Sequence, residues 1–199
     1  MAAGTKYNLS AEYKPEELYR VETGVRKSGP WKLDITNLTV GSTLPAFTPV
    51  QADLKVRTIV PVRNLQVVEA YTTGDTALSI KVKKGSLAYV GMFIGSGKKG
   101  AKVTAIDKSN KDYDALTIAA AFGENIAKDA ILFEATAAGG TSKKNTANFV
   151  LYDEKKVEDD GPVLCTLLMQ AYEVKIPKLH MPIHELDMEG LTDRFQFEY

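Results

Sequence analysis

The sequence has few of the residues that catalysis, metal binding or covalent cross-linking through sulfur would require. It contains one cysteine and two histidines among 199 residues. Cys165 lies in the apolar run VLCTLLM without a cationic neighbour, so we expect a small buried hydrophobe rather than a reactive thiol. A chain of this length needs no disulfide or metal to stabilise its core, and we expect it to fold in a reducing cytoplasm.

The sequence also lacks an excess of charge and long apolar runs. Its 25 Lys and Arg residues balance 25 Asp and Glu residues, so it has no long-range field to attract a polyanion, and we expect no nucleic-acid partner. The first residues, MAAGTKYNLSAEYKPEEL, have no apolar core of the kind a signal peptide needs, and no run approaches the length of a membrane span. We therefore expect neither export nor membrane anchoring.

What the sequence does contain is strand patterning interrupted by turn signals, which predicts a mainly β protein. Within residues 74–136, Leu78, Ile80 and Val82 alternate with polar residues, as in a strand with one buried face. Glycines then divide this segment into several short apolar pieces, which is typical of a small β-sandwich or β-barrel. We interpret residues 74–136 as an inserted small β domain.

The segments on either side of this insert have the pattern of one further β-sandwich or β-barrel domain. Residues 49–61 predict two strands joined by a tight turn near Asp53, with prolines at the ends, where a missing amide does least damage. Residues 136–145 have linker composition, and two apolar runs follow them. We therefore predict that residues 31–73 and 144–180 are two halves of one domain that the insert interrupts.

The two ends of the chain are predicted to be an N-terminal arm, residues 1–30, and an aromatic C-terminal tail, residues 181–199. The arm is polar, includes three tyrosines and cannot bury itself, so it either lies on a partner or docks loosely on its own domain. In the tail, residues 183–191 have the pattern of a short helix, and Phe195, Phe197 and Tyr199 alternate as in a last strand.

Three motifs suggest small-ligand sites, and each has a simpler interpretation. The run from Gly95 to Gly100 matches the phosphate-loop pattern GxGxxG, but it leads into a strand pattern rather than a helix, so we interpret it as a hairpin loop. An oxygen-rich segment could hold a hard cation such as calcium, but two lysines interrupt it and a turn between strands fits better; it contains Asp107, Ser109, Asn110, Asp112 and Asp114.

The two histidines, His180 and His184, have helical spacing, but Pro182 lies between them and would break the helix that a zinc pair needs. We therefore predict no cofactor, no metal and no catalytic residue. A group of lysines makes the insert locally basic. These lysines either form a solvated face or bind anionic glycans or a neighbouring acidic subunit. They are Lys83, Lys84, Lys98, Lys99 and Lys102.

Several stretches resemble proteins that decorate the heads of tailed bacteriophages. Residues 43–53, TLPAFTPVQAD, resemble the opening of head-decoration proteins, and FVLYDE at 149–154 with the run 163–172 resembles the later half of the same domain. Phrases of the insert, including VKKG at 82–85 and VGMF at 90–93, are similar to β modules of head-fibre and auxiliary capsid proteins of phages of gut bacteria.

This resemblance implies a structural virion protein that is assembled in the host cytoplasm and stabilises the outside of an expanded capsid. Such proteins are often trimeric and bind the major capsid protein, commonly through an arm near the N-terminus. They need self-complementary surface rather than a pocket. Two other classes stay open: an adhesive or glycan-binding surface module that uses the insert, and an enzyme with an unrecognised site.

Aromatic and apolar residues near the two ends are the predicted contacts with the capsid or with a sister subunit, because aromatic side chains anchor interfaces and terminal segments bury themselves poorly. The alternative is that the terminal strands fold onto their own domain. The predicted contact residues are Tyr7, Leu9, Tyr13, Leu18, Tyr19, Trp31, Phe195, Phe197 and Tyr199.

Overall fold

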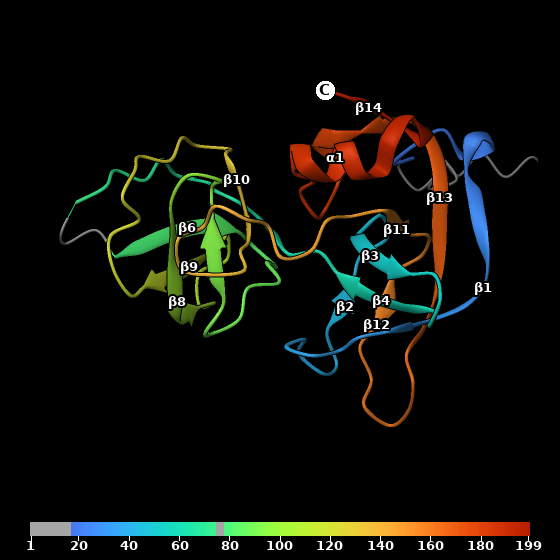
Figure 1. Cartoon of the computed structure of the whole chain (residues 1–199), viewed down its shortest axis with the longest axis horizontal. Coiled ribbons are helices and arrows are strands. Elements are labelled where there is room, and N and C mark those ends of the chain that lie inside the picture. The colour runs from blue at the N-terminus through green and yellow to red at the C-terminus, as the bar shows by residue number, and fades with distance from the viewer. Residues whose placement is uncertain (1–16, 75–77) are drawn as a thin grey trace, which may run out of the picture.

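The computed structural model describes residues 17–74 and 78–199, which form two β bodies that lie side by side (Figure 1). This confirms the prediction of a mainly β fold. In chain order the elements are the 3-10 helix η1 (Val21–Thr23), strands β1 (Val25–Leu33), β2 (Thr43–Leu44), β3 (Pro49–Asp53), β4 (Thr58–Pro61), β5 (Asn64–Gln66), β6 (Ser79–Lys83), β7 (Phe93–Gly95), β8 (Gly100–Asp107), β9 (Tyr113–Ile118), β10 (Ile131–Glu134), β11 (Phe149–Leu151), β12 (Lys155–Lys156) and β13 (Leu164–Lys175), the 3-10 helix η2 (Ile176–Lys178), helix α1 (Glu185–Leu191), the 3-10 helix η3 (Thr192–Arg194) and strand β14 (Phe195–Glu198).

The first body is a sheet that closes on itself. Its strand order is β1-β4-β3-β11-β13-β14, and β1 also pairs with β13, so five of the strands form a closed ring of pairings. The long strand β13 makes this closure possible, since it pairs with β1 on one side and with β11 on the other. Closure leaves these strands without a free edge, and their inward side chains fill the barrel. That core includes Trp31, Leu33, Ile59, Phe149 and Leu167.

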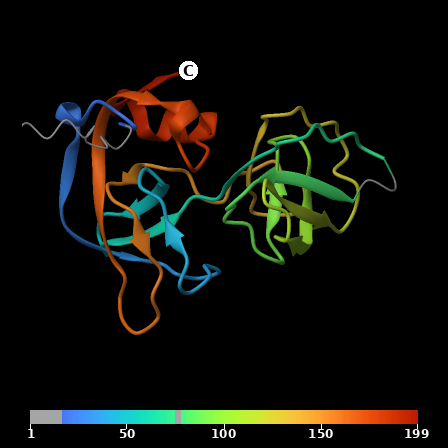
Figure 2. The same cartoon turned by 180° about the vertical axis from the view of Figure 1, so that it is seen from behind.

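A second apolar cluster covers one outer face of this barrel. Strand β11 is buried on both faces: Phe149 and Leu151 point into the barrel, whereas Val150 packs with the C-terminal elements. Helix α1 and β14 supply Leu191 and Phe195 to this outer cluster. The C-terminal tail is therefore part of the first body (Figure 2).

The second body is a separate barrel-like sheet with the strand order β5-β10-β7-β8-β9-β6. A bridge between Val67 and Val82 connects the end of β5 to β6, so this sheet also closes. Its core contains Leu65, Ile80 and Leu132 together with other buried apolar residues. Two chain segments join the bodies, one entering at β5 and one returning after β10 (Figures 1 and 2).

The sheets begin earlier in the chain than the boundaries that we predicted from the sequence. We placed the start of the insert at residue 74, but Leu65, Val67 and Tyr71 already lie in the core of the second body. They do so because β5 pairs with β10 from the far end of the insert, a contact that no local pattern encodes. Likewise β1 begins at Val25, inside the predicted arm, because it pairs with β13.

Candidate interaction surface

Two of the predicted contact residues are buried in the first body. Trp31 is 2 % exposed and stacks on Phe149 inside the barrel, and Phe195 is 4 % exposed with its ring edge-on to Phe47. Neither side chain is available to a partner in this fold. The structure corrects our expectation at these positions, because the pairing of β14 with β13 carries Phe195 onto the chain's own apolar face, as in the alternative that we left open.

The other predicted residues differ from one another in their exposure. Leu18, Tyr19 and Phe197 are half-buried at the edge of the outer cluster, where Tyr19 contacts Phe47, whereas Tyr199 is almost fully exposed. Residues 18–20 are held against β13 by two backbone hydrogen bonds, one from the amide of Arg20 and one to the carbonyl of Leu18. Tyr7, Leu9 and Tyr13 lie outside the described residues.

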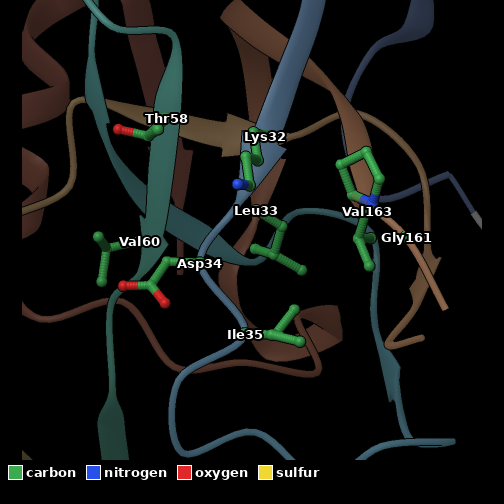
Figure 3. A pocket seen from close by; sticks show the side chains of 9 residues that line it. Lys32, Leu33, Asp34, Ile35, Thr58, Val60, Gly161 and Val163 are labelled. Carbon is green, nitrogen blue, oxygen red and sulfur yellow. The ribbon is translucent and has the colours of Figure 1, made fainter. Parts of the chain in front are cut away.

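Three hollows of the first body meet at the start of β13. One of about 620 Å³ is lined by the end of β1, by β4 and by residues 161–163 (Figure 3). A second of about 430 Å³ lies between residues 26–30 and residues 164–166, and a third of about 510 Å³ lies between residues 154–158 and residues 162–164. Val163 and Leu164 each line two of these hollows. We call the residues that line the three hollows the β1 surface.

The chemistry of the β1 surface is apolar and basic. Leu164 is 48 % exposed, and the buried residues Leu33 and Val163 also line these hollows. Exposed cations lie along and beside β1, and within the described residues none of them pairs with a carboxylate. These cations are Arg26, Lys32 and Arg57, the last of which lies over Gly29. A surface of this kind suits an acidic partner with an apolar contact.

Three carboxylates also line the hollows, those of Asp34, Glu154 and Glu158. Asp34 lines the largest hollow and accepts a hydrogen bond from the amide of Thr36 at 2.9 Å. Hydrogen bonds from Thr36 hold the pKa of Asp34 below its ordinary value, so the carboxylate keeps its charge at neutral pH.

The glycine-rich run has a structural explanation. It forms the turn between β7 and β8, as predicted, and the backbone of Gly140 packs directly against it. A Cβ at Gly95 or Gly100 would lie 2.3 or 2.5 Å from its nearest neighbour, in the first case an atom of Gly140. Glycine is needed there for close backbone approach.

The oxygen-rich segment and His184 also have local structural roles. Asp107 and Asn110 accept hydrogen bonds from backbone amides two residues ahead, which confirms the predicted turn between β8 and β9. His184 caps α1 through a hydrogen bond from the amide of Leu186. Across residues 17–74 and 78–199, no group of three metal-ligating side chains is placed to hold an ion. Within the same residues no helix is long and apolar enough to cross a membrane.

Sequence reasoning missed a buried polar cluster where the two bodies meet. Arg63 and Glu134, each about 4 % exposed or less, form an ion pair at 3.1 Å. Glu134 also accepts hydrogen bonds from Lys144 at 2.8 Å and from Tyr89 at 2.7 Å. Burial alone would raise the pKa of Glu134, but these hydrogen bonds and the charge of Arg63 outweigh it and hold the pKa below its ordinary value.

No sequence signal identifies this cluster, because its members lie on different segments of the chain that meet only in the folded structure. Arg63 lies just before β5, and Lys144 lies in the segment that we interpreted as a linker from its composition. The bodies therefore meet through fixed polar contacts as well as through the connecting segments. A further contact runs from the Lys83 amine to the Leu179 carbonyl at 3.1 Å.

Comparison with known proteins adds one finding. A family model described as "Head fiber protein" of phages matches residues 2–194, which spans both bodies. No curated protein and no solved structure matches the chain.

Proposed function

This chain belongs to the phage head fiber protein family, and from that premise we propose that it decorates the outside of the phage head by binding the major capsid protein. Membership makes it a structural component of the phage head. The family match over nearly the whole chain is the observation that carries the proposal, because it includes both bodies rather than one widespread module.

We assign the capsid contact to the first body, because most of the exposed large apolar residues lie there. Among the described residues, nine of them belong to this body, and Leu78 and Val90 belong to the second body. A protein that assembles on a capsid must present exposed apolar area on the side that makes the contact. The nine are Val21, Val25, Val40, Leu54, Val56, Tyr152, Leu164, Leu186 and Tyr199.

The β1 surface is the centre of this proposed contact. Its exposed Leu164 supplies apolar area, and its exposed cations Arg26 and Lys32, with Arg57 beside them, favour an acidic face on the capsid protein. Unpaired surface charges mainly speed and orient association, and added salt screens them. Attachment should therefore weaken as the salt concentration rises.

The N-terminal segment is the second proposed contact. Leu18 and Tyr19 dock on the first body beside β13. We propose that this segment, including Tyr7, Leu9 and Tyr13, reaches the capsid, that the chain assembles as a homo-oligomer, with a trimer favoured, and that Tyr199 contacts a sister subunit. In this arrangement the second body faces outward.

No specific observation favours the adhesive alternative. That alternative requires an exposed aromatic shelf on the second body. The exposed large apolar residues among the described part of that body, Leu78 and Val90, are both aliphatic.

The test is co-sedimentation of the purified chain with phage heads that lack it. The full chain should attach, and a chain without residues 1–16 should lose attachment while keeping its far-ultraviolet circular dichroism, because the truncation ends before the docked Leu18. Native mass spectrometry of the free protein should show an oligomer. Normal attachment of the truncated chain would refute the role of the arm. Failure of the full chain to attach would refute capsid binding itself.

A further inference from the structure

Three polar side chains from distant parts of the chain meet in a buried site between the two bodies. Asn64 is the first residue of β5, Lys143 lies on the returning segment, and Asp187 lies in α1. Asn64 and the Lys143 side chain are each 3 % exposed, and Asp187 is fully buried. The site lies next to the Arg63–Glu134 cluster but has its own partners.

The contacts place an amine against an amide carbonyl. Lys143 Nζ lies 2.9 Å from Asn64 Oδ1 and also pairs with Asp187 Oδ2. Asn64 Nδ2 donates to Asp187 Oδ2 at 2.8 Å and to the carbonyl of Pro182 at 2.9 Å. Since a backbone carbonyl can only accept, the contact with Pro182 fixes which end of the amide carries oxygen. One carboxylate oxygen therefore contacts both the amine and the amide nitrogen.

The surroundings make the Lys143 amine easier to deprotonate. The Lys143 amine lies 5.9 Å from the ring centroid of the fully buried Phe133, against which His184 packs edge-on. Burial lowers the pKa of Lys143, and the charge of Asp187 opposes this shift. The pKa of His184 is also lowered, by burial and by the charge of Lys143. Such a site excludes the water that would compete as a nucleophile.

The carboxylate itself is held in place. The amide of Ala147 donates to Asp187 Oδ1 at 2.9 Å, and the amide of His184 donates to Oδ2 at 3.3 Å. These bonds leave Oδ2 facing both reacting groups. A fixed proton acceptor beside an amine and an amide is the arrangement that amide exchange requires.

We propose that Lys143 and Asn64 become joined by an isopeptide bond that forms without a second protein, with Asp187 transferring the protons. Lys143 first gives a proton to Asp187, and its free electron pair then attacks Cγ of Asn64 to form the new C–N bond. Asp187 passes its proton to Nδ2 and accepts another from the attacking nitrogen. The Cγ–Nδ2 bond breaks, ammonia leaves and takes up the remaining proton, and no oxidant or reductant is needed.

The bond would fasten the two segments that connect the bodies. It would enclose the second body in a covalent loop running from residue 64 to residue 143. A force that pulls the ends of the chain would then pass across the bond instead of through the folded second body. This property would suit an outward-facing module, although the chemistry does not depend on the proposed function.

The test is the mass of the intact, denatured full chain. We expect the wild-type protein to be lighter than its sequence by one ammonia molecule, and the Lys143→Arg variant, which keeps the charge, to have its full sequence mass. The Asp187→Asn variant should lose the reaction as well. The neighbouring Lys144→Arg variant is the matched control and should still lose ammonia, because Lys144 pairs with Glu134 instead.

Tryptic digestion then locates the bond. Residues 64–81 should be recovered joined to residues 129–144, with no cleavage after Lys143. A wild-type chain with its full sequence mass would overturn the proposal, whatever the variants do. Ammonia loss that persists in Lys143→Arg would also overturn it, since Asn64 would then have closed on its own backbone.

Discussion

The clearest energetic prediction concerns the buried carboxylate of Glu134. Replacing Glu134 with Gln keeps the shape of the side chain but removes the counter-charge of Arg63, which is 4 % exposed. Removing one partner of a buried ion pair costs about 3–5 kcal/mol, because the other charge is left without compensation. Lys144 adds little to this cost, since its side chain is 47 % exposed and water can solvate it.

A matched control comes from an exposed pair of the same kind. Glu69 pairs with Lys81 at 2.5 Å, but the Glu69 side chain is 65 % exposed, so Glu69→Gln should cost no more than about 1 kcal/mol. Urea unfolding followed by circular dichroism measures both variants. At a slope of about 1–3 kcal/mol per molar, Glu134→Gln should lower the midpoint by at least about 1 M. Equal losses in the two variants would refute the reasoning from burial.

Three further predictions concern the same fold. The pKa of Glu134 is held below its ordinary value of 4.5, so the carboxylate contributes its full stabilisation above pH 4.5 and loses it as the pH falls through the folded pKa. When the free energy of unfolding is measured against pH, it should therefore fall in acid, and it should fall less in Glu134→Gln than in the wild type. Phe195→Ala should cost about 3–5 kcal/mol in urea unfolding, whereas Tyr199→Ala, at an almost fully exposed position, should change stability by less than about 0.5 kcal/mol. Gly140→Ala should cost at least about 1 kcal/mol of stability and lower the melting temperature measured by calorimetry, because Gly140 has a φ of 65° and an added Cβ would lie 2.2 Å from the Lys99 carbonyl oxygen. Gly139→Ala should leave the melting temperature unchanged, because an added Cβ there meets open space.

Local sequence signals predicted most of the individual strands. The alternation around Ile80 and Val82 corresponds to β6, whose two inward side chains are buried. The turn predicted near Asp53 forms because the Asp53 carboxylate accepts hydrogen bonds from the amides of Lys55 and Val56. In each of these cases the residues that determine the structure are neighbours in the chain.

Features that depend on distant residues could not be predicted in this way. The start of the second body at β5 depends on its pairing with β10, about 65 residues further along the chain. The pairing of β14 with β13 decides that Phe195 is buried and Tyr199 exposed, although the two positions have the same alternation in the sequence. The sites around Glu134 and Lys143 need side chains from several separate segments of the chain. Composition alone indicated a linker for the segment that holds Lys143 and Lys144.

The most direct test of the account is binding of a β1-surface variant to phage heads that lack this protein. Leu164→Asp places a charge at the centre of the proposed contact. Val90→Asp is the control, because it places the same charge at an exposed aliphatic position of the second body. Co-sedimentation should show that Leu164→Asp weakens attachment at least about tenfold, equivalent to about 1.4 kcal/mol, while Val90→Asp binds like the wild type. Undiminished binding of Leu164→Asp, or loss of binding in Val90→Asp alone, would contradict the assignment of the capsid contact to the first body.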